Sequence, residues 1–313
     1  MSERPTRLSV PRIIRRRKGT ADAWAMDSRI VPEETPIAFS YNGTTHAVMM
    51  ATPADMEDFA VGFSLSEGIV STMEGISEIA IEEHDEGIDV QVRLAAEAGQ
   101  ELTDRRRRMA GPVGCGLCGI ESIEQALKPV ASVDKVRLAL APEEIADAVN
   151  SLSERQPLHG ETGAVHAAGF YVPGQGILAV REDVGRHNAL DKLAGALCRA
   201  GVAGQTGAVV ITSRVSIEMV QKTAIIGASV LIAVSAPTAL AVRTAEAAGM
   251  TLIALVRGEE FDVFTRPERV PVALAQVKTK GDELAVNGPA KPNPDSAAST
   301  LIQSPTVRLV QYG

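Results

Sequence analysis

The stretch GAVVITSRVSIEMVQKTAIIGASVLIAVSAPTALAVRTAEAAGMTLIALVRG, residues 207–258, decides the fold. Its short apolar runs are separated by amphipathic segments of about a dozen residues, a pattern typical of strands that alternate with helices. The predicted strands are 207–213, 230–236 and 251–258, and the predicted helices are 216–228 and 237–249. Such βαβ units predict a mainly parallel sheet with helices on both faces.

The surrounding sequence extends this pattern and predicts an α/β domain over residues 140–275. A helix at 142–156, a hairpin of 164–172 with 177–182, and a helix at 186–201 are expected before the quoted stretch. Residues 31–110 predict a separate, small α+β domain. Its strand candidates are 35–42, 46–52, 76–83 and 87–94, and its helix is 53–70, with Phe59, Phe63 and Leu65 facing the sheet.

The two ends of the chain have the composition of unstructured segments. Seven of the first eighteen residues are Arg or Lys, which predicts a basic, disordered tail over residues 1–30. Residues 276–313 are rich in Pro, Ala and Ser at their start and predict a mostly disordered extension.

Composition excludes several classes of function. Hydrophobic residues make up 45% of the 313 residues and aromatic residues 3%, so an aliphatic core is expected. The formal charge of −8 disfavours nucleic acid and membrane surfaces as partners. No apolar run approaches the length of a membrane span, and three cysteines do not form a disulfide framework. We therefore expect a cytoplasmic protein that binds neither nucleic acid nor membrane.

Polar residues follow the predicted strands of the α/β domain, where such sheets bind ligands. Ser213 and Ser235 are predicted N-caps, at helix starts that favour anions. Arg214 and Arg257 carry the fork of donors that matches phosphate. Together with Arg186, His187 and Asn188 at the start of another helix, these residues predict a crevice for a phosphate-bearing ligand.

Several of these polar residues also have a structural interpretation. The serines could simply cap helices, and Asp183, Arg186, His187 and Asn188 could brace a helix rather than bind a ligand. His166 in its apolar strand favours a structural role. Glu218 and Lys222, four residues apart on one helix, fit a surface pair as well as a functional one.

Two of the three cysteines lie close together in the sequence, in the motif GCGLCG, and could bind a metal or carry out a reaction. The motif GCGLCG places Cys115 and Cys118 among glycines, which predicts a mobile loop within a linker at 111–139. A zinc site needs a second pair of ligands, and Cys198 stands alone in a predicted helix. The segment HGE at 159–161 matches part of the zinc deaminase motif, but the cysteine motif precedes it instead of following. We therefore expect no zinc.

Two further interpretations of GCGLCG lack their structural context. A dinucleotide fingerprint needs a buried strand before it, and RRRRMAGPV is not one. A thioredoxin-type motif needs its first cysteine at a helix N-terminus within a βαβ unit. Arg105–Arg108 could lower a thiol pKa, or could form a solvated basic stretch. A thiolate in this loop could accept sulfane sulfur, hold it as a persulfide and pass it on, with the second cysteine forming a disulfide.

Several segments resemble one family, the formate dehydrogenase accessory sulfurtransferases known as FdhD. AGPVGCGLCGIES (110–122) and REDVGRHNALDKLAG (181–195) carry the resemblance, which extends from about residue 31 to 272. It implies a cytidine deaminase-like fold, with a mixed sheet that has helices on both faces, and a homodimer. It also implies a carrier that takes sulfur from a cysteine desulfurase and delivers it to the molybdenum cofactor, bis-molybdopterin guanine dinucleotide, before this enters formate dehydrogenase.

The resemblance also implies roles for individual residues. Cys115 would bear the persulfide and Cys118 would assist it. The cofactor would contact Phe264, Thr265, Arg266, Pro267, Glu268 and Arg269. This segment follows the last strand of the predicted crevice, so both arguments are expected to point to one place. The chain departs from the family at Ala164 and Ser213, where the family usually has glycine, and at Thr212, where the family usually has serine. The alternatives are a cofactor-binding chaperone without sulfur transfer and a thiol-disulfide oxidoreductase.

Overall fold

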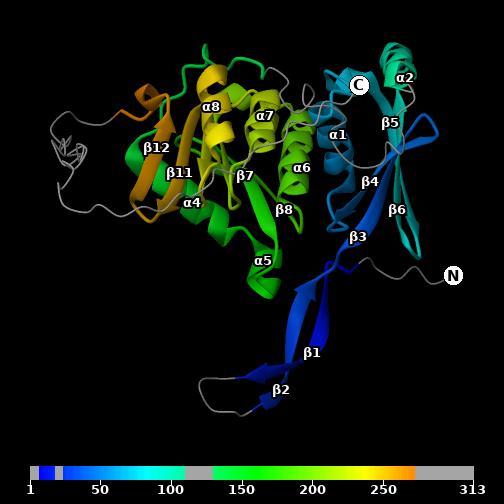
Figure 1. The fold of residues 1–313 in the computed structure, drawn as a ribbon, viewed down its shortest axis with the longest axis horizontal. Helices are drawn as coiled ribbons and strands as arrows, with labels where there is room; N and C mark the ends of the chain where they lie inside the picture. The colour runs from blue at the N-terminus through cyan, green and yellow to red at the C-terminus, as the bar shows by residue number, and fades with distance from the viewer. Residues whose placement is uncertain (1–6, 18–23, 110–129, 272–313) are drawn as a thin grey trace, which may run out of the picture. The chain divides into compact units, whose positions relative to one another are not determined.

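The computed structural model describes residues 7–17, 24–109 and 130–271, and its larger sheet is built from the quoted stretch and its flanks (Figure 1). The six strands lie in the order β12-β11-β10-β9-β7-β8. They are β7 (His166–Val172), β8 (Gly176–Asp183), β9 (Ala208–Ile211), β10 (Val230–Ala233), β11 (Thr251–Arg257) and β12 (Glu260–Thr265).

This sheet is mixed, as the resemblance implied, and the parallel pairs that the βαβ pattern predicted lie at its centre. The pairings β9–β10 and β10–β11 are parallel, and the other three are antiparallel. The reason lies in two tight connections, because strands joined by a short turn must run antiparallel. Gly174 and Gly176 have φ of 72° and 79° in the β7–β8 turn, and Gly258 has φ of 60° between β11 and β12.

Helices cover both faces of the sheet, as the alternation predicted. Helix α4 (Pro142–Glu154) packs on one face, where it meets Ala208 and Val210. Helices α6 (Arg186–Arg199), α7 (Ile217–Ile226) and α8 (Ala239–Ala248) pack on the other, against Val209 and Ile211. The mixed α/β class is thereby confirmed, whereas the cytidine deaminase-like detail stays a prediction.

A second sheet precedes this one, with strand order β4-β3-β6-β5. Its strands are β3 (Thr35–Tyr41), β4 (Thr44–Ala51), β5 (Ile76–His84) and β6 (Gly87–Leu94). Helix α1 (Met56–Ser66) covers one face with Phe59 and Phe63, and the Phe63 ring stacks on Phe39 at 4.6 Å. Leu65 packs at the margin of this core, as predicted. Helix α2 (Ala96–Met109), which the sequence pattern did not predict, adds the buried Leu102.

The two sheets belong to one compact unit, although the sequence predicted separate domains. Helix α1 of the first segment crosses α6 of the second at Gly62 and Gly195. A Cβ added at Gly62 would lie 1.7 Å from the carbonyl oxygen of Asp191, and one at Gly195 would lie 1.8 Å from that of Asp58. Backbones this close need glycine, so the helices join the two segments into a continuous structure.

The first thirty residues also differ from expectation. Strands β1 (Ser9–Arg17) and β2 (Trp24–Pro32) form an antiparallel hairpin, so the prediction of a disordered tail was wrong for them. Contacts between the two strands stabilise the hairpin, and they include an ion pair of 2.8 Å between Arg16 and Asp27. No strand signal is visible in the sequence here, because the apolar residues of β1 do not alternate: Ile13 and Ile14 are adjacent and three arginines follow them. The predicted loop at 111–129 and the extension at 276–313 lie outside the described residues.

Shorter elements complete the described part of the chain. Helix α5 (Pro157–Thr162) precedes β7, and three 3₁₀ turns are η1 (Met73–Gly75), η2 (Gly204–Thr206) and η3 (Pro267–Arg269). Among the described residues, no helix has both the length and the apolar composition needed to cross a membrane.

Candidate functional site

Polar side chains gather at the edge of the larger sheet where the parallel strands end. His166 begins β7 and pairs in register with Asp183 at the end of β8. The end of β9 lies beside them, because the Ala167 amide donates to the Thr212 hydroxyl at 3.0 Å. We call His166, Arg186, His187, Ser213 and Glu218 the carboxyl-edge site.

A histidine and a carboxylate face each other within this site. His187 Nε2 lies 3.6 Å from Glu218 Oε2, and the Ser216 hydroxyl donates to the same carboxylate at 2.6 Å. Burial lowers the pKa of His187, and the positive charge of Arg186 adds to this shift. Burial opposes ionisation of Glu218, but the bonds from Ser216 and its own backbone leave its pKa below the usual value. A neutral imidazole therefore faces an ionised carboxylate at neutral pH.

One buried donor of the site has no acceptor. Among the described residues, Arg186 Nε finds no hydrogen-bond partner, and His187 Nε2 faces only the Glu218 carboxylate, at 3.6 Å. A buried polar atom left unsatisfied costs about 1–3 kcal/mol, so such atoms point to an absent partner. His166 lies close enough to Arg186 for that charge to lower its pKa further, after the larger effect of burial. This edge is thus rich in donors and suited to an anion.

The side chains of Asp183 and Asn188 are buried, and their hydrogen bonds are with other residues of the protein interior. Asp183 is fully buried and accepts hydrogen bonds from Thr52, Gly185, Asn188 and Lys192, the last at 2.6 Å. The Asn188 amide donates both to Asp183 and to the Met50 carbonyl. The structural alternative that we left open for these two side chains is the one that their contacts favour.

The predicted caps were wrong. Helix α7 begins after Ser216, and α8 begins after Thr238, whose hydroxyl accepts from the Ala241 amide. The Ser213 hydroxyl instead donates to the Arg214 carbonyl at 3.2 Å. Ser235 follows β10, and its carbonyl accepts from Leu255, which has a left-handed φ of 59°. Arg214 and Arg257 are exposed.

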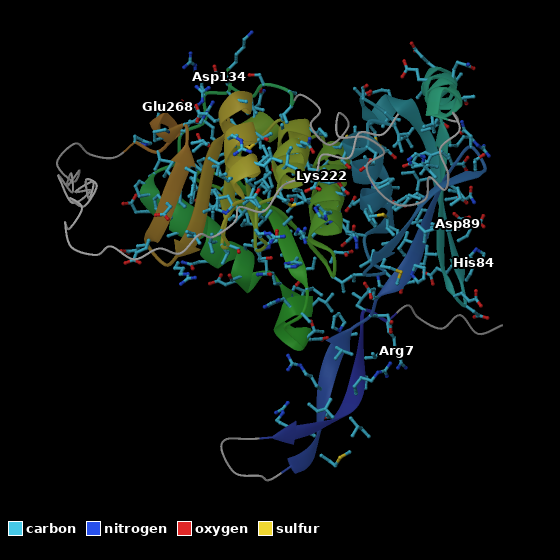
Figure 2. The ribbon with its side chains drawn as sticks, viewed as in Figure 1. Arg7, His84, Asp89, Asp134, Lys222 and Glu268 are labelled. Carbon is cyan, nitrogen blue, oxygen red and sulfur yellow. The ribbon has the colours of Figure 1, made fainter. Side chains whose placement is uncertain are left out.

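The segment 264–269 lies at the opposite edge of the sheet. In the antiparallel pair β11–β12, Thr265 stands beside Leu252 near the start of β11, while Arg257 at its end stands beside Glu260. Figure 2 shows Glu268 near Asp134, at that opposite edge. The expectation that this segment shares one place with the carboxyl ends was therefore wrong, because β12 reverses direction and carries the chain back across the sheet.

Some side chains of segment 264–269 are held by hydrogen bonds or ion pairs, and others are exposed to solvent. Arg269 is buried and donates to the carbonyls of Val133, Asp134, Val136 and Gly249 and to the Thr251 hydroxyl. The Thr265 hydroxyl donates to the Met250 carbonyl. Arg266, with a left-handed φ of 47°, pairs with Glu246 at 3.0 Å and Asp134 at 3.5 Å. Phe264, Pro267 and Glu268 are exposed. Cofactor binding by this segment stays a prediction.

The similarity to known proteins extends over the smaller sheet and the larger sheet, including the residues at both ends of the larger sheet's strands. A family model described as the FdhD/NarQ family matches residues 32–271. The chain belongs to this family. It is 59% identical over 254 residues to the sulfur carrier protein FdhD of Agrobacterium fabrum, covering 81% of this chain and 93% of that protein. It is 56% identical over 243 residues to the FdhD of Brucella abortus, covering 78% and 90%.

A solved structure agrees with the fold of this FdhD/NarQ family member. The crystal structure of a protein described as a formate dehydrogenase accessory protein, from Desulfotalea psychrophila, superimposes with a TM-score of 0.67 at 28% identity. The alignment covers 85% of this chain and 100% of that one.

The cysteines of this FdhD/NarQ family member divide into two kinds. Cys115 and Cys118 lie outside the described residues, so the structure does not place them. Cys198 lies on α6, half-buried against the core of the smaller sheet. Burial raises its pKa, and Glu74 adds to the rise, so Cys198 holds little thiolate at neutral pH.

Sequence reasoning missed two buried ion pairs, and the hydrogen bonds by which their lysines reach the other segment of this FdhD/NarQ family member. Lys222 pairs with Asp191 at 2.6 Å and donates to Ser66 of α1 at 2.9 Å, so it does not pair with Glu218. Lys192, fully buried, pairs with Asp183 and donates to the Thr52 carbonyl. The spacing of Asp191 and Lys192 gave no signal, because their partners are distant in sequence.

Proposed function

We propose that this chain is a sulfur carrier that accepts sulfur as a persulfide on Cys115. The observation that carries the proposal is the chain's 59% identity to a protein named sulfur carrier. The three cysteines support it, because Cys198 is half-buried with a raised pKa and the remaining two form the glycine-rich pair. The donor is a persulfide on a cysteine desulfurase, as the resemblance implies.

The transfer balances as two thiol exchanges. The Cys115 thiolate attacks the terminal sulfur of the donor persulfide, forming Cys115–S–SH and releasing the donor thiol. The Cys118 thiolate then attacks Sγ of Cys115, which forms a disulfide and expels hydrosulfide to the acceptor. A thiol reductant must reduce the Cys115–Cys118 disulfide before the next cycle.

The acceptor in this proposal is the molybdenum cofactor, bis-molybdopterin guanine dinucleotide, which is later inserted into formate dehydrogenase. The carboxyl-edge site supports an anionic ligand, since Arg186 Nε is a buried donor without a hydrogen-bond partner among the described residues, and the imidazole of His187 lies near its charge. We assign the cofactor's pyrophosphate to this edge, with Ser213, Arg214 and Ser235 beside it. Segment 264–269 is kept as a second contact, through its exposed Phe264.

The site assignment is tested with guanosine diphosphate, which carries the guanine and pyrophosphate of the cofactor. We expect Arg186→Ala to weaken its binding about 10- to 100-fold in calorimetry, because a charged hydrogen bond is lost. Arg266→Ala serves as the matched variant at the opposite edge. Unchanged affinity in Arg186→Ala with a loss in Arg266→Ala would move the ligand to segment 264–269.

Sulfur delivery is tested by formate dehydrogenase activity in cells that rely on this chain. Cys115→Ala should abolish the activity while guanosine diphosphate binding persists, and Cys198→Ala should leave both intact. Retained activity in Cys115→Ala would favour a cofactor-binding chaperone. Turnover as a disulfide reductase without any effect of Arg186→Ala would favour a thiol-disulfide oxidoreductase. Cytoplasmic location and a homodimer stay predictions of the sequence.

A further inference from the structure

Strand β11 contains a leucine in a backbone conformation that leucine rarely adopts. Leu255 has a φ of 59°, in the left-handed region. There the Cβ atom lies too close to the following carbonyl oxygen, so the conformation is unfavourable for a bulky side chain, whereas glycine adopts it without this clash. A leucine that is kept in such a conformation indicates that its side chain is needed for function.

The conformation of Leu255 belongs to a β-bulge in the pairing of β11 with β12. The register of the two strands shifts between Ala254 and Arg257. Two residues of β11, Leu255 and Val256, therefore oppose a single residue of β12, Phe261. A bulge of this kind adds one residue to a strand and redirects its side chain, and bulges are frequent beside ligand sites.

The bulge removes Leu255 from the core of the larger sheet. Ala254 is buried in the core that faces α6, α7 and α8, and Val256 is buried in the core that faces α4. Leu255 lies between these two residues, is half-buried, and belongs to neither cluster of the described part of the chain. Core packing therefore does not explain why this position holds leucine.

Leu255 lies at the end of the strands that carries the carboxyl-edge site. Its amide donates to the Ser235 carbonyl at 3.4 Å, just after β10 ends. The next residue, Ala236, accepts from the Val215 amide at 3.2 Å, in the connection that follows β9. Backbone contacts thus lead from the bulge toward the edge at which His166 begins β7. Strand β11 is three strands away from β7, which is about 14 Å at the usual strand spacing.

Building on the proposed function, in which Arg186 and His187 hold a pyrophosphate, we propose that Leu255 packs on the heteroaromatic ring of the same ligand and helps to select it. A nucleoside diphosphate carries its ring at one end and its phosphates at the other, and in extended form it spans the distance between the two places. The leucine side chain covers the ring, because apolar surface of both is then removed from water. Glycine would form the same bulge without strain but would leave the ring uncovered.

The test compares guanosine diphosphate with inorganic pyrophosphate in calorimetry of the full chain. Leu255→Gly keeps the bulge and removes the side chain, so it should bind guanosine diphosphate about 5- to 20-fold more weakly. Its affinity for pyrophosphate should stay unchanged. Leu255→Met, which retains an apolar side chain, should keep most of the affinity for guanosine diphosphate. Leu178→Ala, at an exposed leucine near the start of β8, is the control and should leave both affinities unchanged.

Urea unfolding checks the strain independently of the ligand. Leu255→Gly should unfold at a higher urea concentration than Leu255→Ala, because both lack the leucine side chain and only alanine retains the unfavourable conformation. Equal midpoints would contradict the strain from which the role of Leu255 is inferred.

The two probes separate the role of Leu255 from the proposed function. Unchanged affinity for guanosine diphosphate in Leu255→Gly, or an equal loss for both probes, would overturn the assignment of Leu255 to the ring. A loss in Arg186→Ala without a loss in Leu255→Gly would overturn this assignment alone. A wild-type chain that binds neither probe, or an Arg186→Ala variant that binds both as the wild type does, would overturn the pyrophosphate site as well.

Discussion

Two adjacent residues of the carboxyl-edge site, Arg186 and His187, determine how an anionic ligand would bind there in this account. The pKa of His187 lies below its ordinary value, so the imidazole is neutral at pH 7.5 and an incoming anion favours its protonation. Affinity for guanosine diphosphate should therefore rise as the pH falls from 8 to 6, with proton uptake. Calorimetry in buffers of different ionisation enthalpy measures this uptake.

A control separates His187 from the titration of the phosphate itself. His187→Asn should bind more weakly at pH 6 and lose most of the uptake, while the part due to phosphate remains. An identical pH profile in the variant would show that His187 does not face the ligand.

The buried pair of Lys192 and Asp183 gives a second prediction at the scale of residues. Burial lowers the pKa of Lys192, and Asp183 partly offsets this, so the pair is stable only while both partners are present. Lys192→Met should lower the free energy of unfolding by about 3–5 kcal/mol, since it leaves a buried carboxylate without its countercharge. Urea unfolding measures the loss, and Lys135→Met, at an exposed lysine, is the control. A loss no larger than in the control would contradict the assignment.

At the scale of elements, stability depends on how closely α1 and α6 cross. Gly195→Ala should lower the free energy of unfolding by about 3 kcal/mol or more, because the new Cβ meets the Asp58 carbonyl at 1.8 Å. Gly160→Ala in α5, where no atom lies within 4 Å of the added Cβ, should change it little. Thermal unfolding of both variants checks the difference. Equal transition temperatures would show that the helices can separate at no cost.

The elements themselves were largely readable from the sequence, and their arrangement was not. Apolar periodicity located α6, α7, α8 and the strands between them because each has one face in a continuous core. Helix α2 was missed because its sequence is strongly polar, and among its described side chains, residues 96–103, only Leu102 is buried. Strand β12 was missed because its alternating apolar residues follow a strand directly, after a turn at Gly258.

At the scale of the whole molecule, the sequence could not show which polar residues meet. Ser213 and the segment 264–269 both follow strands of the larger sheet. Because β12 runs antiparallel to β11, the two nevertheless lie at opposite ends of the strands. The union of the two predicted domains was also hidden, because it depends on Gly62 and Gly195 and on the ion pairs that Asp58 makes with Arg181 and Arg199. The motifs at 110–122 and 181–195 indicated the family, and tertiary packing decided which residues meet in the site.

Sulfur transfer is the central claim, and intact-protein mass spectrometry tests it most directly. The chain is incubated with a cysteine desulfurase and cysteine, and its mass is compared with those of Cys115→Ala, Cys118→Ala and Cys198→Ala. We predict a gain of one sulfur atom that is lost in Cys115→Ala and kept in Cys198→Ala. No gain in any form, or a gain that persists in Cys115→Ala, would contradict the carrier role assigned to Cys115.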